Sequence, residues 1–386
     1  MRIARIIEYF PPHIGGMERH GLILSEEQIK LGHEVDVYIG VGGLKPNSKL
    51  KSDFKNSPKS DFVKLDFEIH KMPLQFLPLY SKARRFWFNI WAYFAVKKHH
   101  KRNPYSIIHL HGDFVEAYFG GKLSKKLRIP AILTIHAGLN KKLLKPENKK
   151  YFENIKKIIC VSREIANELK IIGIAEEKIE IISSGVYLSG FKDVDKNAVI
   201  NLRDKYSKPI IISVGVLRIN KGFSYLIGSF KEILNKFDSA TLLIIGDGLI
   251  RYDLEKQAQG IPNIYFLGQQ EHNEVVKYLC ASDIFILSSI STEGDREGTP
   301  TSIMEAMAAG LPVIAANVGG SSYLIKDGEN GLLVEEKNSN ELARAMIKLI
   351  GDENLRQKIK MKNLEDIKQK DWPIIVKKIT DVYFQR

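Results

Sequence analysis

The chain has 386 residues, of which 44% are hydrophobic and 27% are charged. This is the composition of an ordinary globular protein, and the length allows two domains with substantial cores. The 58 Lys and Arg residues exceed the 45 Asp and Glu residues and give a net charge of +13, which suits phosphorylated ligands, anionic lipid or nucleic acid as partners. No stretch approaches the roughly 20 apolar residues that cross a bilayer.

Two further features bear on the cellular compartment. The two cysteines, Cys160 and Cys280, lie far apart in apolar surroundings and are interpreted as reduced core residues. No N-terminal signal sequence is recognisable, because residues 1–7 already have the pattern of a strand. We therefore expect a cytoplasmic protein.

Short apolar runs alternate with helix-like segments along the whole chain. Strands separated by helices imply βαβ units and parallel sheets, so we predict an α/β protein with two doubly wound, Rossmann-like domains. The expected strands cover residues 2–7, 34–39, 106–110, 131–135, 157–161 and 179–182 in the first half, and residues 209–214, 241–245, 264–267, 283–287, 312–315 and 331–334 in the second.

The boundary between the two domains is expected between residues 183 and 204, where periodicity is lost and Gly, Ser and Asp gather. We assign residues 1–187 to the first domain and 188–371 to the second. The amphipathic segment 372–386 is expected to return to the first domain. Asp193 and Asp195 form an Asp-x-Asp pattern in the linker, but no strand leads into it, so we do not interpret it as a metal site.

Residues 81–102 have basic ends around an aromatic middle that contains Trp87 and Trp91. This pattern is typical of an interfacial helix that lies on an anionic membrane. It also fits a helix that covers the strand expected at 106–110. Both interpretations hold together if one face of the helix is buried.

The second domain carries an acidic loop between a strand and a helix, at residues 288–310. A helix that begins directly after a strand offers free N–H groups to an anionic ligand. Glu297 and Glu305 should face one crevice at the carboxyl end of the sheet, where open α/β sheets bind ligands. Glu305 also has a structural alternative, because Ser302 and Glu305 fit the Ser-x-x-Glu pattern of a capping box.

In the first domain, Gly15 and Gly16 follow the first strand and would let the backbone approach a ligand closely. Their spacing differs from the dinucleotide-binding fingerprint, which argues against an oxidoreductase. His109, His111 and His136 end two strands at the same edge of the sheet, and alternation places His109 and His111 on one side of their strand.

Two loops of the second domain add further candidates. Arg218 and Lys221 follow the strand at 209–214 and could neutralise a diphosphate. Gly246 and Asp247 follow the strand at 241–245, in another turn that allows a close approach.

These loops carry the motifs GGMERH, SVGVLRINKG, GDGLIRYDL, FLGQQEHNEV, REGTPTSIMEAMAAGLPVIA, VGG and DGENGLLV. Their order and spacing resemble those of the retaining nucleotide-sugar glycosyltransferases of family four, which have the two-domain GT-B fold. The resemblance implies that the second domain binds a UDP-sugar or GDP-sugar and that the first binds a glycan or lipid-linked acceptor. It implies no cofactor and no metal.

The resemblance also implies roles for individual residues. Glu297 would contact hydroxyls of the transferred sugar, Glu305 the ribose and Lys221 the diphosphate. Gly16 would approach the sugar donor, and His111 would lie near the reacting carbon. The remaining expected ligand-binding positions are Gly15, His136, Arg218, Gly246, Asp247, Gly298, Thr299, Pro300 and Thr301.

The sequence departs from the family pattern at two places. Val216 stands where the family often has Arg, and Arg218 is the candidate replacement for that charge. The linker reads Ser184-Gly-Val-Tyr187 instead of the common Asn-Gly-Val-Asp.

The expected mechanism stabilises the departing nucleoside diphosphate with Lys221, Arg218 and helix-start N–H groups. The departing phosphate oxygen then takes the proton of the acceptor hydroxyl on the same face, which gives retention. A covalent route would need a carboxylate below the anomeric carbon, for which Glu297 is the candidate. The alternatives are a nucleotide-sugar epimerase or phosphorylase of the same fold, and a basic nucleic-acid-binding protein, although recognised nucleic-acid motifs are absent.

Overall fold

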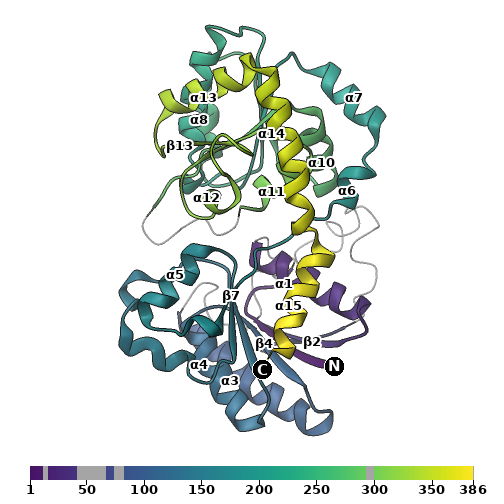
Figure 1. The fold of residues 1–386 in the computed structure, drawn as a ribbon, viewed down its shortest axis with the longest axis vertical. Helices are drawn as coiled ribbons and strands as arrows, with labels where there is room; N and C mark the ends of the chain where they lie inside the picture. Colours follow the sequence, from purple (N-terminus) through teal and green to yellow (C-terminus); the bar gives the residue numbers. More distant parts are fainter. Residues whose placement is uncertain (12–15, 41–66, 74–81, 293–299, 386) are drawn as a thin grey trace. The chain divides into compact units, whose positions relative to one another are not determined.

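The computed structural model describes residues 1–11, 16–40, 67–73, 82–292 and 300–385. The chain divides into two compact units (Figure 1). The first comprises Met1–Ser184 and Pro373–Arg386, and the second comprises Gly185–Trp372. Each unit is built around one parallel sheet with helices on both faces, which confirms the predicted doubly wound architecture.

The first sheet has the strand order β3-β2-β1-β4-β5-β6-β7. All twelve strands expected from the sequence are present in the two units, and among the described residues one further strand, β3, was missed. Its four residues EIHK are mostly polar and lie at the sheet edge, so neither length nor apolar pattern marked them as a strand. The bounds are β1 (Arg2–Ile7), β2 (Glu34–Ile39), β3 (Glu68–Lys71), β4 (Ile107–His111), β5 (Ala131–Ile135), β6 (Lys157–Cys160) and β7 (Ile179–Ile181).

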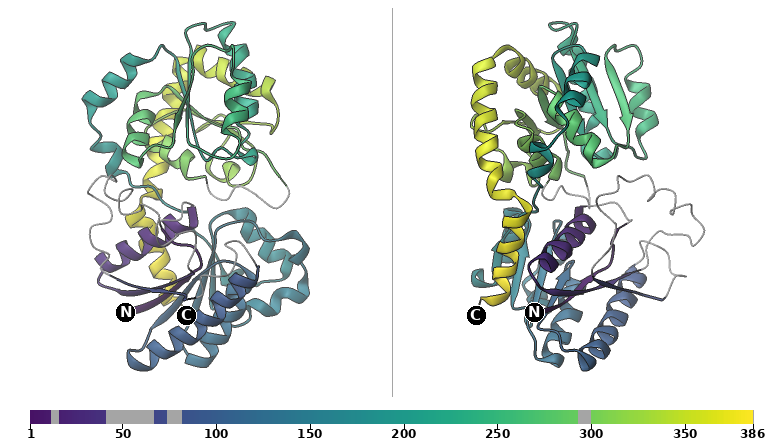
Figure 2. Two further views of the ribbon diagram at one scale, coloured as in Figure 1. Left: turned by 180° about the vertical axis from the view of Figure 1, so that it is seen from behind. Right: turned by 90° about the vertical axis from the view of Figure 1, so that its right-hand side faces the viewer.

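Helices cover both faces of the first sheet because its strands point apolar side chains to both sides. One face packs on α3 (Lys82–Arg102), α4 (Phe114–Leu127) and α5 (Arg163–Ile172). The opposite face carries α1 (Gly16–Lys30) and α15 (Trp372–Phe384), the helix drawn in yellow in Figure 2. On α15, the Tyr383 hydroxyl lies 2.5 Å from Nδ1 of His109 and accepts a hydrogen bond from Gln28 of α1.

The second sheet has the order β10-β9-β8-β11-β12-β13. Its two faces are distinguished by alternate residues of the same strands. Ile211 packs with α8 and α13, whereas Ile212 packs with α10 and α11. The strands are β8 (Ile210–Val214), β9 (Thr241–Ile245), β10 (Ile264–Gly268), β11 (Ile284–Leu287), β12 (Val313–Ala316) and β13 (Leu332–Val334). The longer helices are α7 (Lys196–Lys205), α8 (Phe223–Leu234), α9 (Arg251–Gln257), α10 (His272–Ala281), α11 (Thr301–Ala308), α13 (Ser339–Gly351) and α14 (Glu353–Asp366).

Asp195 and the two cysteines have structural roles. Asp195 is the N-cap of α7, and its carboxylate accepts hydrogen bonds from the backbone of Asn197 and Ala198, which explains the Asp-x-Asp pattern structurally. Cys160 is buried in the core of the first unit and Cys280 is half-buried, and neither forms a disulfide. Among the described residues, no helix has the length and apolar character required to span a membrane.

Candidate functional site

The loops after β8 and β11 meet closely at the carboxyl end of the second sheet. Gly222 has a φ of +63°, and a Cβ there would lie 1.9 Å from the carbonyl oxygen of Ser288, so only glycine fits. The Ser288 hydroxyl donates to the Gly222 carbonyl at 3.0 Å, and the Ile290 amide donates to the Asn220 carbonyl at 2.8 Å. These contacts fix the backbone beside Lys221, which ends the short 3₁₀ turn Ile219–Lys221.

The loop after β9 is held against the loop after β8 in the same way. A Cβ on Gly246 would lie 1.9 Å from the Gly215 carbonyl oxygen, and the Leu217 amide donates to the Asp247 carbonyl at 2.9 Å. The Asp247 side chain is exposed and accepts hydrogen bonds from the Gly248 amide and from Arg251. The glycine therefore brings the two loops together, while the Asp247 carboxylate is engaged within its own turn.

Glu305 lies on α11 with only 7% of its surface exposed. The capping-box alternative for this residue is wrong, because α11 begins at Thr301 with Pro300 in the N-cap position and Ser302 already inside the helix. Instead, a Glu305 carboxylate oxygen lies 3.6 Å from Nδ1 of His272, the first residue of α10. Sequence reasoning quoted the motif that contains His272 but gave this histidine no role.

The other predicted site residues differ in their exposure to solvent, and some lie outside the described residues. Arg218 is exposed beside Lys221, Pro300 is buried and Thr301 is half-buried at the start of α11. Gly16 is the exposed first residue of α1. Four predicted site residues lie outside the described part of the chain: Gly15, Glu297, Gly298 and Thr299.

The first unit brings together three buried histidines, His20, His109 and His111, and the half-buried His136 at the carboxyl end of its sheet. His111 Nδ1 lies 2.9 Å from His136 Nε2, and the ring of His20 lies 4.7 Å from that of His136. The rings of His109 and His111 stack at 4.5 Å, which confirms that they share one side of β4. Both ring nitrogens of His109 have partners, Tyr383 and Thr134.

Burial determines the charge of this histidine cluster, defined as His20, His109, His111 and His136. It lowers the pKa of His136 to about 3 and places the pKa of the other three well below the usual range. The rings are therefore neutral at pH 7. Within the described residues, Nε2 of His111 has no hydrogen-bond partner, so it is available to a ligand as a neutral group.

His111 and His136 line a cavity of about 210 Å³ at the ends of β1, β4 and β5. Glu8, which follows β1 directly, lines the same cavity with its side chain buried. Arg85 of α3 reaches the cavity but is held by carboxylates, since its Nε donates to Glu116 at 2.9 Å and its Nη1 donates to Asp113 at 3.1 Å. Sequence reasoning missed Glu8, because a single acid after a strand resembles any solvent-exposed residue.

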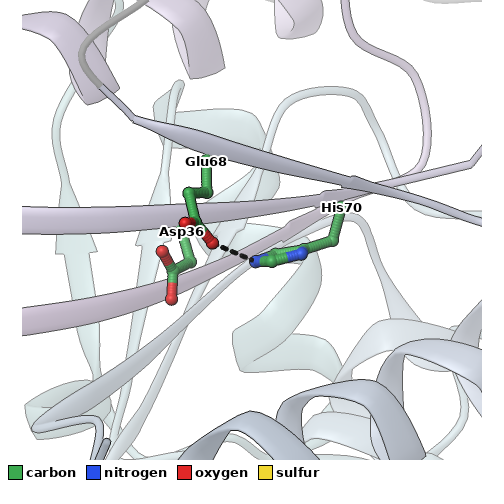
Figure 3. Close-up of side chains that lie close together, drawn as sticks. All are labelled: Asp36, Glu68 and His70. Carbon is green, nitrogen blue, oxygen red and sulfur yellow. Dashed lines mark ion pairs between the residues drawn. The ribbon is translucent and has the colours of Figure 1, made fainter.

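A second polar cluster, formed by Asp36, Glu68 and His70, lies on β2 and β3 (Figure 3). Glu68 and His70 approach to 3.6 Å. Asp36, the buried carboxylate, is already bound by the Arg2 guanidinium at 2.5 Å and by the Tyr105 hydroxyl. We interpret the cluster as a structural network that ties the sheet edge together.

The sequence resembles known glycosyltransferases over most of its length. It matches the family described as Glycosyltransferase Family 4 over residues 14–189 and the family described as Glycosyl transferases group 1 over residues 196–365. An uncharacterised glycosyltransferase of Methanocaldococcus jannaschii is 30% identical over 380 residues, which cover 96% of this chain and 95% of that protein. A phosphatidyl-myo-inositol mannosyltransferase of Mycobacterium leprae is 25% identical over 99% of this chain and 96% of its own.

Solved structures agree on the fold. The crystal structure of HepE from Anabaena in complex with UDP superimposes with a TM-score of 0.76 at 19% identity, over 99% of each chain. The same protein, solved with UDP-glucose, gives a TM-score of 0.72 over 99% of this chain and 98% of its own, again at 19% identity. The sequence matches and the two parallel-sheet units lead to one conclusion: this chain belongs to glycosyltransferase family 4 and has the GT-B fold.

Proposed function

We propose that this glycosyltransferase moves a sugar from a UDP-sugar or GDP-sugar to a hydroxyl of a glycan or lipid-linked acceptor, with retention and without a required metal. The domain of residues 188–371 binds the nucleotide sugar, and residues 1–187 with 372–386 bind the acceptor. The observation that carries the proposal is the buried Glu305 carboxylate, which lies in the same unit and at the same end of the sheet as Lys221. The complexes of the Anabaena protein with UDP and UDP-glucose support the choice of nucleotide.

The mechanism assigns separate tasks to these residues. Lys221, Arg218 and the N–H groups at the start of α11 stabilise the negative charge that develops on the departing diphosphate. Glu305 accepts a hydrogen bond from a ribose hydroxyl, and Glu297 binds hydroxyls of the transferred sugar. His111, neutral because it is buried, hydrogen-bonds near the reacting carbon. A phosphate oxygen of the departing group takes the acceptor proton as the new glycosidic bond forms on the same face.

The ribose role of Glu305 gives the first test. Replacing Glu305 with Gln should weaken the binding of UDP or GDP about tenfold, because a buried carboxylate forms stronger hydrogen bonds to hydroxyls than a neutral amide does. Isothermal titration calorimetry with each nucleoside diphosphate measures the dissociation constant. The control is Glu274→Gln on α10, a half-buried glutamate that already pairs with Lys277. Equal affinities of wild type and Glu305→Gln would contradict the assignment.

We also propose that the first domain binds an anionic membrane surface through the outer faces of α3 and α4. The buried face of α3 includes Phe88 and Val96, whereas Phe86, Trp87 and Phe94 are exposed. Trp91 differs from the expectation for a headgroup contact, because it packs against the rings of Tyr38 and Phe88. The aromatic-basic surface therefore consists of Phe86, Trp87, Phe94, Lys98 and Lys101 of α3 with Tyr118, Lys122 and Lys125 of α4.

This surface combines what an anionic interface attracts, namely exposed aromatic rings and lysine side chains. Sedimentation with vesicles of phosphatidylglycerol should carry the protein down at low salt and release it at 0.5 M salt. A double variant with Trp87→Ser and Phe94→Ser should bind at least fivefold more weakly. Ile200→Ser on α7, which removes an equally exposed apolar side chain from the second unit, should bind like wild type. Vesicle binding that is the same at low and high salt, and the same in wild type and the double variant, would contradict the proposal.

A further inference from the structure

Glu8 is a buried carboxylate that has a hydrogen bond with Tyr9 and one further oxygen without a donor. Its side chain is 6% exposed, and its Oε1 atom has no hydrogen-bond partner among the described residues. Burial, with a contribution from the charge of Glu116, raises the pKa of Glu8 to about 7, against the opposing effects of Arg85, Arg84 and the hydrogen bond with Tyr9. A buried acceptor atom without a hydrogen-bond donor destabilises the folded protein. Such an atom is typical of a site where a ligand supplies the missing donor.

The other charged groups of the 210 Å³ cavity, Arg85, Asp113 and Glu116, are already paired with one another. Arg85 donates to Glu116 and Asp113 through three of its nitrogens. Glu116 also accepts hydrogen bonds from the Asp113 amide at 2.9 Å and from the Asn89 side chain at 3.0 Å. Arg85 is therefore engaged in holding carboxylates and is not offered to an anionic ligand.

Two buried side-chain atoms of the cavity remain without partners in the described residues, Oε1 of Glu8 and Nε2 of His111. The first accepts hydrogen bonds when it is ionised, and the second accepts or donates one according to its tautomer. A hydroxyl group satisfies both kinds of atom. A ligand with several neighbouring hydroxyls can therefore form hydrogen bonds with both of these atoms.

Charge and size restrict the ligand further. The cavity wall carries three carboxylates, Glu8, Asp113 and Glu116, against the single guanidinium of Arg85, and its histidines are neutral. A phosphate or carboxylate group would meet a net negative wall. The volume of about 210 Å³ is below the roughly 300 Å³ at which pockets for drug-sized ligands begin, so the cavity itself takes about one ring.

We propose that Glu8 is the residue that recognises the acceptor, and that this cavity takes an uncharged, hydroxyl-bearing ring whose hydroxyl donates to Oε1 of Glu8. The inference rests on the proposed transfer to an acceptor bound by the first domain. Any phosphate of a lipid-linked acceptor lies outside the cavity, so Glu8 contacts only the ring of the acceptor. Sugars and cyclitols share this chemistry.

Saturation-transfer-difference NMR on the full chain tests the assignment with methyl α-mannopyranoside, methyl α-glucopyranoside and myo-inositol as separate probes. At least one probe should receive saturation from wild type. Its apparent affinity should fall at least tenfold in Glu8→Ala and by a smaller factor in Glu8→Gln, whose amide oxygen still accepts a hydrogen bond. Inorganic phosphate at equal concentration should not displace the probe.

The matched control is Glu27→Gln, a buried glutamate on α1 that pairs with Lys30 and lies outside the cavity. This variant should bind the probe like wild type. Unchanged probe binding in Glu8→Gln and Glu8→Ala, displacement by phosphate, or no binding of any probe to folded wild type would overturn the inference. If Glu8→Ala does not fold, the affinity of Glu8→Gln for the probe alone tests the assignment.

Stabilisation by UDP or GDP, recorded on the same samples, separates the two levels of the proposal. If a nucleoside diphosphate stabilises every variant but the affinity for the probe is the same in wild type and in the Glu8 variants, the acceptor assignment fails and the proposed transfer stands. If neither nucleotide stabilises wild type, the proposed function itself fails.

Discussion

Replacing Lys221 with alanine should reduce glycosyl transfer at least tenfold and leave the thermal unfolding of the protein unchanged. Lys221 ends a turn whose backbone is locked against β11 by Gly222 and Ser288, so its position is fixed before any substrate arrives. A preorganised positive charge stabilises the departing diphosphate without reorganisation, and the loss of one such group in other enzymes costs 10²–10³ in rate. The expected effect therefore falls on turnover more than on folding.

The assay for this prediction is release of the nucleoside diphosphate in the presence of the sugar donor and acceptor, with calorimetric unfolding as the control for stability. Lys231→Ala, which removes an exposed lysine from α8 in the same unit, should keep wild-type activity. Arg218→Ala should lower the rate by less than Lys221→Ala, because its exposed side chain is less constrained. Full activity of Lys221→Ala would exclude Lys221 from the site.

Acid should unfold the first unit at a pH where most proteins of this composition are stable. The histidine cluster holds four neutral rings whose pKa values lie below the ordinary value near 6.5. Below pH 6.5 the unfolded chain binds protons that the folded chain does not. The stability contributed by these rings is therefore complete above pH 6.5 and is lost as the pH falls toward the folded pKa, which is about 3 for His136.

The size of the effect follows from the number of rings. Each neutral histidine loses on the order of 1 kcal/mol of stability per pH unit below 6.5, and the four rings together lose several kcal/mol per pH unit. Glu8 opposes one of the four, because its raised pKa of about 7 means that its contribution is present at low pH and is lost as the pH rises through 7. Differential scanning calorimetry between pH 7.5 and 5.0 should show the first unit melting at progressively lower temperature.

His136→Gln supplies the matched variant. It removes one of four titrating rings, and Glu8 already offsets one of them, so the dependence of stability on pH should become shallower by about a third, even if the variant is less stable at pH 7. The slope rather than the melting temperature is the quantity compared. A melting temperature that stays constant from pH 7.5 to 5.0 would contradict the assignment of neutral buried rings.

The sequence predicted the fold well because most of its strands are short apolar runs, separated by helix-like segments, that need no tertiary information to be recognised. The missed strand β3 is short and polar, and only pairing with β2 defines it. The family resemblance also correctly favoured a glycosyltransferase over an epimerase or a nucleic-acid-binding protein.

The site was harder to predict, because burial and pairing are tertiary facts. The pattern of Ser302 and Glu305 satisfied a capping box, but the helix starts at Thr301, and Glu305 lies near His272 from a different helix. Glu8 had no signal at all, since its importance comes from the cavity that α3, α4 and the strand ends build around it. The roles assigned to Glu297 and Lys221 remain predictions from the family pattern.

Binding of a nucleotide sugar by this chain is the central claim, and ligand-induced stabilisation tests it most directly. Thermal unfolding should be followed across a panel of UDP-, GDP- and ADP-sugars at millimolar concentration without added metal. A ligand at 100 times its dissociation constant stabilises the folded state by about 2.7 kcal/mol, so one nucleotide class should raise the melting temperature by several degrees. If no member of the panel shifts the melting temperature of the folded protein, the proposed donor chemistry is wrong.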